Sequence, residues 1–161
     1  GRKCAIIRKN SYFEVLMKNS NAEKLSALLK KKNIAAEPVV YTETGEAYIV
    51  LPTTVKDTNI NYRVIIVFAA NSVYVDIRCF KIFTEINEEL KTPILEIVNA
   101  LNCEKRWGKF YLEPEGEISL LESLFSSKGK FKAADIIELA IMLKDNIDEL
   151  YHRITVLKNL V

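Results

Sequence analysis

The 161-residue chain carries 23 lysines and arginines against 21 aspartates and glutamates, and 49% of its residues are hydrophobic. This composition predicts one domain with a sizeable core, because a domain of about 150 residues buries roughly 70% of its unfolded surface. Cys4, Cys79 and Cys103 form neither a CxxC pair nor a ligand cluster with the single histidine, which argues against a disulfide framework and a zinc site. Apolar runs fall short of the ~20 residues of a membrane-spanning helix. We therefore expect a cytoplasmic protein with reduced thiols.

The net charge of +2 conceals an uneven distribution along the chain. Residues 1–32 are strongly basic, whereas the rest of the chain is mildly acidic. A basic region of this kind can attract nucleic acid or an anionic membrane surface, and Lys30, Lys31 and Lys32 are the candidate anion contacts. The alternative is a solvated helix face. Since the charge is not accompanied by glycine-rich or stacking-aromatic patterns, nucleic acid is not the expected partner.

The first predicted element is a helix. We interpret residues 1–20 as a basic extension and residues 21–161 as a single α+β domain. Asn21 stands where an N-cap belongs, and leucines at helical spacing predict a helix over about 21–32. The lysines at its C-terminal end are favourable there, because the helix dipole is negative at that end.

From residue 37 the hydrophobic period becomes that of strands. The runs PVVYTE and EAYIVLP flank a Thr44-Gly45 turn, and Pro52 ends or edges the second run. The segment YRVIIVFA is apolar enough for a central strand, and VYVDIRCF alternates between a core face and a wetter face. Consecutive strands with short links predict an antiparallel meander.

A second helix is predicted to open at Thr92-Pro93, with threonine as its N-cap. The strands KFYLE and GEISLLESLF follow around a turn at Pro114-Glu115-Gly116. A long last helix starts at about Ala133 and carries a heptad seam of apolar residues. The order α-β-β-β-β-α-β-β-α predicts an α+β fold with an antiparallel sheet of about five to six strands and helices packed on it. The seam consists of Ile136, Ala140, Leu143, Ile147, Leu150, Ile154 and Leu157.

Catalytic and cofactor motifs such as GxGxxG, GxxxxGK(S/T) and GxSxG do not occur in the sequence. A triad would have to use His152, the only imidazole, and its helix brings neither serine nor cysteine near it. We expect His152 to pair with Asp148 on the helix surface; the alternative is a catalytic or pH-sensing role. The acidic cluster at 113–117 lacks the register of a calcium loop. The sequence therefore predicts a protein that is not an enzyme and that binds neither cofactor nor metal.

Two features are candidate contacts with a partner protein. Trp107, in the link between the second helix and the next strand, is either a partner contact or a plug between helix and sheet. The heptad seam either packs on the domain's own sheet or associates with another chain, through Leu143, Ile147, Leu150 and Ile154.

The run IVNALNCEKRWGKFYLEPEGEISL joins an asparagine-bearing helix end to a link, a strand, a turn and a second strand. Through this run, the segment Ala36 to Ile154 resembles the YbjN-like bacterial family, also called the sensory transduction regulator family. The structural relatives of that family include type III secretion chaperones. The Asn99/Asn102 pair matches the family's helix end. The resemblance implies a small α+β domain, commonly a homodimer, that holds other proteins rather than catalysing a reaction. The basic first helix departs from the secretion chaperones, which are acidic throughout.

The sequence is compatible with two functions. The first is a noncatalytic protein-binding or regulatory module, chaperone-like and homodimeric, whose partner the sequence does not identify. The alternative is an anion-binding regulator that uses the basic N-terminal region on nucleic acid or a membrane surface.

Overall fold

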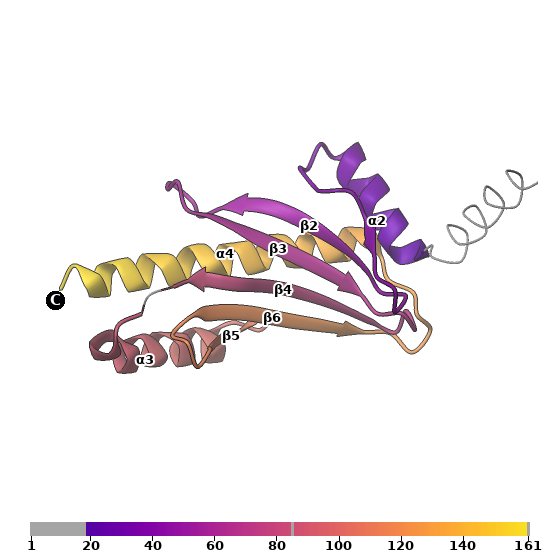
Figure 1. Cartoon of the computed structure of the whole chain (residues 1–161). Helices are drawn as coiled ribbons and strands as arrows, with labels where there is room; N and C mark the ends of the chain where they lie inside the picture. The colour runs from indigo at the N-terminus through magenta and orange to yellow at the C-terminus, as the bar shows by residue number, and fades with distance from the viewer. Residues whose placement is uncertain (1–18, 85, 161) are drawn as a thin grey trace, which may run out of the picture.

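A computed structural model describes residues 19–84 and 86–160, so most of the predicted N-terminal extension, with Cys4, lies outside the described residues. The described chain forms a six-stranded antiparallel sheet and three helices, which confirms the predicted α+β class and element order (Figure 1). Within these ranges no helix has the length and apolarity needed to cross a membrane. The elements are α2 (Ser20–Lys31), β1 (Val40–Tyr41), β2 (Ala47–Thr54), β3 (Asn61–Phe68), β4 (Tyr74–Phe83), α3 (Glu88–Glu104), β5 (Lys109–Leu112), β6 (Ile118–Phe125) and α4 (Ala133–Lys158).

The strand order is β1-β2-β3-β4-β6-β5, so the first four strands form the predicted meander. Pro52 lies inside β2, paired with Arg63 of β3. β1 is only two residues long and pairs no further than Tyr48, so β2 is an edge strand at Pro52. The Glu37 N–H donates to the Val50 carbonyl on this outer edge, which places the missing N–H of Pro52 on the same unpaired side.

The helix α2 begins one residue earlier than predicted, and its N-cap is Asn19 rather than Asn21. The Asn19 side chain accepts hydrogen bonds from the N–H groups of Asn21 and Ala22. Asn21 is buried, and its amide donates to the Gly129 carbonyl at 2.9 Å. Two asparagines two residues apart both suit a cap, and the apolar pattern alone does not distinguish them.

The helix α3 also begins earlier than predicted, at Glu88, so the expected start at Thr92-Pro93 is wrong. Asn87 is the N-cap, and its Oδ1 accepts from the Leu90 N–H at 3.0 Å. Pro93 lies in the second turn, where its ring costs the helix only one hydrogen bond near its exposed start.

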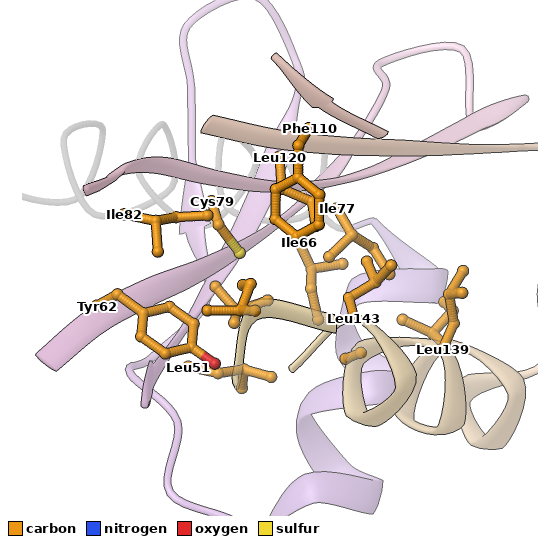
Figure 2. Packing of buried hydrophobic residues seen from close by; sticks show 14 of the residues in the cluster. Leu51, Tyr62, Ile66, Ile77, Cys79, Ile82, Phe110, Leu120, Leu139 and Leu143 are labelled. Carbon is orange, nitrogen blue, oxygen red and sulfur yellow. The ribbon is translucent and has the colours of Figure 1, made fainter. Parts of the chain in front are cut away.

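All three helices pack on one face of the sheet. The α4 helix runs along the strands, α2 contacts it toward the β2 side, and α3 lies beside β5 (Figure 1). Isoleucine, leucine, valine and phenylalanine side chains fill the space between the helices and the sheet (Figure 2). The apolar seam of α4 is part of this core, so the seam packs on the domain's own sheet, which is one of the two predicted alternatives.

The hydroxyl of Tyr62 is an exception in this core, because it is covered and has no hydrogen-bond partner among the described residues. Burial raises the pKa of Tyr62 above its ordinary value of 10.0. An unsatisfied buried polar group costs about 1–3 kcal/mol. We therefore expect Tyr62→Phe to raise the free energy of unfolding by about 1 kcal/mol, measured by urea titration.

The control for this substitution is Ser127→Ala, since Ser127 is exposed and lies in a turn outside the sheet. Its removal of a solvated hydroxyl should leave the unfolding midpoint unchanged. A lower midpoint for Tyr62→Phe than for the parent would show that the Tyr62 hydroxyl has a partner in solution.

Candidate functional site at the α3–β5 joint

The joint is the segment 102–110, in which the chain leaves α3, turns over the edge of the core and enters β5. The Asn102 side chain binds the backbone of Phe110 twice: its Oδ1 accepts from the N–H and its Nδ2 donates to the carbonyl, both at 2.9 Å. Asn102 thus holds the loop backbone where the chain enters β5. Asn99 is exposed on the helix.

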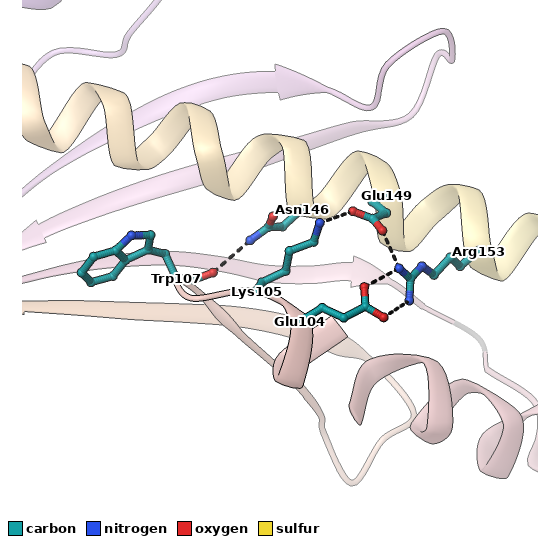
Figure 3. Close-up of polar contacts among 6 residues, drawn as sticks. All are labelled: Glu104, Lys105, Trp107, Asn146, Glu149 and Arg153. Atoms are coloured by element: carbon teal, nitrogen blue, oxygen red, sulfur yellow. Dashed lines mark hydrogen bonds and ion pairs between the residues drawn. The ribbon is translucent and has the colours of Figure 1, made fainter. Parts of the chain in front are cut away.

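The backbone around Trp107 is held by side chains of two other elements. The Trp107 carbonyl accepts from Nδ2 of Asn146 on α4 at 2.9 Å (Figure 3), and the Gly108 N–H donates to Oε2 of Glu122 on β6 at 2.5 Å. The Lys109 amine donates to the carbonyls of Asn102 and Lys105. Four backbone carbonyls and two N–H groups of the joint thus have side-chain partners, which fixes its conformation.

An ion network connects the end of α3 to α4 beside the joint (Figure 3). Arg153 contacts both carboxylate oxygens of Glu104, at 3.2 and 2.6 Å, and Glu149 at 2.5 Å. Lys105 pairs with the other oxygen of Glu149. The Arg153 hydrogen bond holds the pKa of Glu104 below its usual 4.5, and Lys105 lowers that of Glu149. Glu149 and Arg153 stand four residues apart on α4, so their pair lies along one face of that helix.

The indole of Trp107 is 41% exposed and lies outside the core cluster, so it does not plug a gap between helix and sheet. In Figure 3 it points away from the ion network, along α4 toward the start of that helix. Met142 lies one turn before Asn146 on α4 and is also exposed. Arg106 is exposed and has no ion pair with any described residue. We call Trp107, Arg106 and Met142 the Trp107 patch.

A family model described as "Putative bacterial sensory transduction regulator", YbjN, matches residues 21–154 of the chain. The chain belongs to the YbjN family. The matched range begins in α2, ends in α4 and includes the whole joint. Comparison with curated proteins and with solved structures found no match.

Other residues of this YbjN-family chain that the sequence singled out are dispersed. Leu143, Ile147 and Leu150 are fully buried against the sheet, and Ile154 is 3% exposed, so in the described fold none of them is open to a partner. Lys30, Lys31 and Lys32 are exposed at the C-terminal end of α2, where helix carbonyls repel anions and favour cations. Of the candidate contact residues named from the sequence, only Trp107 therefore lies at the joint.

The expected pair of His152 and Asp148 is not formed. Asp148 instead pairs with Lys144 at 2.7 Å and accepts from the Lys56 N–H at 2.9 Å, and His152 is exposed. Asp148 connects α4 to the loop after β2, which the i,i+4 spacing could not indicate. Among the described residues no three His, Cys, Asp or Glu side chains are grouped as metal ligands would be.

Sequence reasoning missed Glu122 and Asn146, although both carried a signal. Glu122 occupies a core-facing position of β6, between Leu120 and Leu124. Asn146 interrupts the apolar face of α4 next to Ile147 and is buried. A polar residue at a core position needs a hydrogen-bond partner, and both find it in the joint.

Proposed function

We propose that this chain is a noncatalytic, chaperone-like regulatory module of the cytoplasm that acts as a homodimer and binds a partner protein through the Trp107 patch. Membership of the YbjN family supports a regulatory role in general terms. The Trp107 patch supports the narrower proposal of protein binding.

The observation that carries the proposal is an exposed tryptophan on an immobilised backbone. Asn146, Glu122 and Asn102 hold the joint from three different elements, while the indole itself remains open to solvent. Tryptophan is enriched among the few residues that dominate binding energy at interfaces. A contact residue that is already ordered loses less conformational entropy on binding.

The charge beside Trp107 indicates the chemistry of the partner. Lys105 is neutralised by Glu149, and the Lys109 amine binds backbone carbonyls, so Arg106 offers the available charge. A partner segment with an apolar anchor next to an acidic residue fits this arrangement.

An enzymatic role finds less support in the described residues. An apolar hollow of about 230 Å³ lies between α2, β2 and α4, and its one charged lining residue, Lys144, is paired with Asp148. The groups with large pKa changes are Tyr41, Tyr62 and Cys79, and none of them lines this hollow. Tyr62 lines a second hollow, which neither Tyr41 nor Cys79 lines and where Glu37 and Arg63 pair with each other. A site for general acid–base chemistry requires such groups to converge in a pocket.

The test compares proteins retained by the parent chain and by Trp107→Ala on a column loaded with bacterial extract. We expect one specific protein to be lost with Trp107→Ala, and Arg106→Glu to weaken its retention. Leu95→Ala is the matched control, because Leu95 is exposed on α3 to a similar degree, 42% against 41%. Melting temperatures of both alanine variants should equal that of the parent, since both side chains are exposed.

Trp107 is the only tryptophan, so its fluorescence reports on the patch alone. Addition of the purified partner should shift its emission to shorter wavelength as the indole leaves water. Retention of the same proteins by parent and Trp107→Ala, or an unchanged emission spectrum with bound partner, would contradict the proposal.

A further inference from the structure

The sheet face opposite the helices is not covered by any helix or strand of the described chain. An antiparallel sheet can expose one face if that face is polar. Here the outward positions instead carry large apolar side chains that are 38% to 65% exposed. They are Tyr74 and Phe80 on β4, Tyr111 on β5, and Leu121 and Phe125 on β6. Large apolar side chains gathered on one exposed sheet face, here with Asp76 and Arg78 between them, indicate an interaction site.

The central strand β4 carries a pattern on this face that is symmetric about Ile77. Tyr74, Asp76, Arg78 and Phe80 are the outward residues, in the order aromatic, acidic, basic, aromatic. Asp76 and Arg78 are paired within the chain at 2.5 Å. Tyr74, Asp76 and Arg78 lie in the regular pairing with β6, and Phe80 is the first residue of the irregular stretch between Cys79 and Phe83.

We propose that a second copy of this chain covers the open face, with a two-fold axis that crosses β4 at Ile77. Such an axis runs perpendicular to the strands, and it places β4 of one copy antiparallel over β4 of the other copy. Asp76 then faces the Arg78 position of the other copy, and Tyr74 faces the Phe80 position. This inference deepens the homodimer of the proposed function by naming its interface.

The area of the face fits this occupant. The strands β2, β3, β4 and β6 are eight to ten residues long. At about 4.8 Å between strands and 3.3 Å per residue, they span roughly 500 Å² in projection. Side-chain relief and the two short edge strands add to the accessible area, which brings it near the ~800 Å² that each partner contributes to a standard interface.

The polar groups specify the register of this dimer rather than its strength. Nε of Arg78 is covered and has no hydrogen-bond partner among the described residues, so this guanidinium is only partly satisfied by Asp76. Because the Arg78 side chain as a whole is 40% exposed, a carboxylate from the other copy can reach the outer N–H groups of the guanidinium and give it a second acceptor. The aromatic and aliphatic side chains supply the apolar burial, and the charge pairs exclude other registers by like-charge repulsion.

The test uses sedimentation of the full chain over a wide concentration range. We expect the parent to be a dimer and Asp76→Arg and Arg78→Asp each to raise its dissociation constant roughly tenfold or more, because like charges then meet on the axis. An equimolar mixture of the two variants should recover a dimer of parental affinity. Glu138→Arg makes the same change of charge on the exposed face of α4 and should alter nothing.

Phe125→Ser provides a second line of evidence that does not disturb the ion pair. Phe125 is 65% exposed, so its loss leaves the fold intact while weakening the dimer. Three results would overturn the proposed dimer. They are a parent that is monomeric at all concentrations, a dimer whose dissociation constant none of the three face variants changes, and a mixture of the two charge variants that stays dissociated. Another protein bound to this face of a monomer would overturn it too. Trp107→Ala should remain dimeric, which separates this outcome from that of the Trp107 patch.

Discussion

Gly108→Ala is expected to lower the free energy of unfolding by about 2–5 kcal/mol, a large part of the 5–15 kcal/mol typical of a domain. Gly108 has φ +76°, a left-handed conformation that costs other residues about 1–2 kcal/mol. A Cβ at this position would also overlap Cδ2 of Leu143, at the centre of the buried seam. Displacing a packed core side chain costs about 1–3 kcal/mol more. Urea titration followed by circular dichroism measures the sum.

Gly45→Ala is the matched control for this result. Gly45 has a similar φ of +86°, but a Cβ there would lie 3.4 Å from the Cβ of Ala70. It therefore incurs the left-handed cost with little overlap, and we expect a loss of only about 1–2 kcal/mol. The difference between the two variants measures the contacts of the added Cβ with Leu143 and Leu120. Equal losses would show that the joint does not press on the seam.

The strands and the long helix were predictable because their residues obey a strict period. Alternation in β4 and the heptad spacing in α4 both report which side chains face the core, and the core needs those side chains whatever else varies. The helix starts were less predictable, because Asn19, Asn21 and Asn87 are chemically equal caps. Only the tertiary contact of Asn21 with Gly129 decides between the first two.

The joint was predictable from its own residues but not from its supports. Asn102, Trp107 and Gly108 lie within seven residues of sequence, and their types suggest a constrained link. Glu122 and Asn146 reach it from β6 and α4, and a spacing rule cannot connect residues that far apart. The ion network is similar: the i,i+4 spacing of Glu149 and Arg153 is visible in the sequence, and the link from Arg153 to α3 is not.

On the open sheet face, the order of residue types along β4 carries information that the burial of those residues does not. Alternation in VYVDIRCF indicated a core face and a wetter face, as the structure confirms. The outward side chains of β4 are half aromatic, and their order is complementary to the same strand reversed. A surface selected for solubility alone has no need of such symmetry, whereas an isologous interface requires it.

Asn102→Ala carries the second large effect, because it removes both hydrogen bonds to Phe110 at once. The N–H and carbonyl of Phe110 lose their partner at the entry to β5, and each buried unsatisfied group costs about 1–3 kcal/mol. Alanine returns at most about 0.7 kcal/mol in helix propensity. Because Asn102 is half-buried and water can reach part of the site, we expect a net loss of about 1–3 kcal/mol.

Asn99→Ala provides the comparison one turn earlier on the same helix. Asn99 is exposed, so this substitution should leave the melting temperature unchanged or raise it slightly. Asn102→Asp retains the acceptor for the Phe110 N–H but turns a carboxylate oxygen toward the Phe110 carbonyl. At neutral pH it should therefore be no more stable than Asn102→Ala. If Asn102→Ala and Asn99→Ala melt at the parent's temperature, the side chain of Asn102 does not hold the joint.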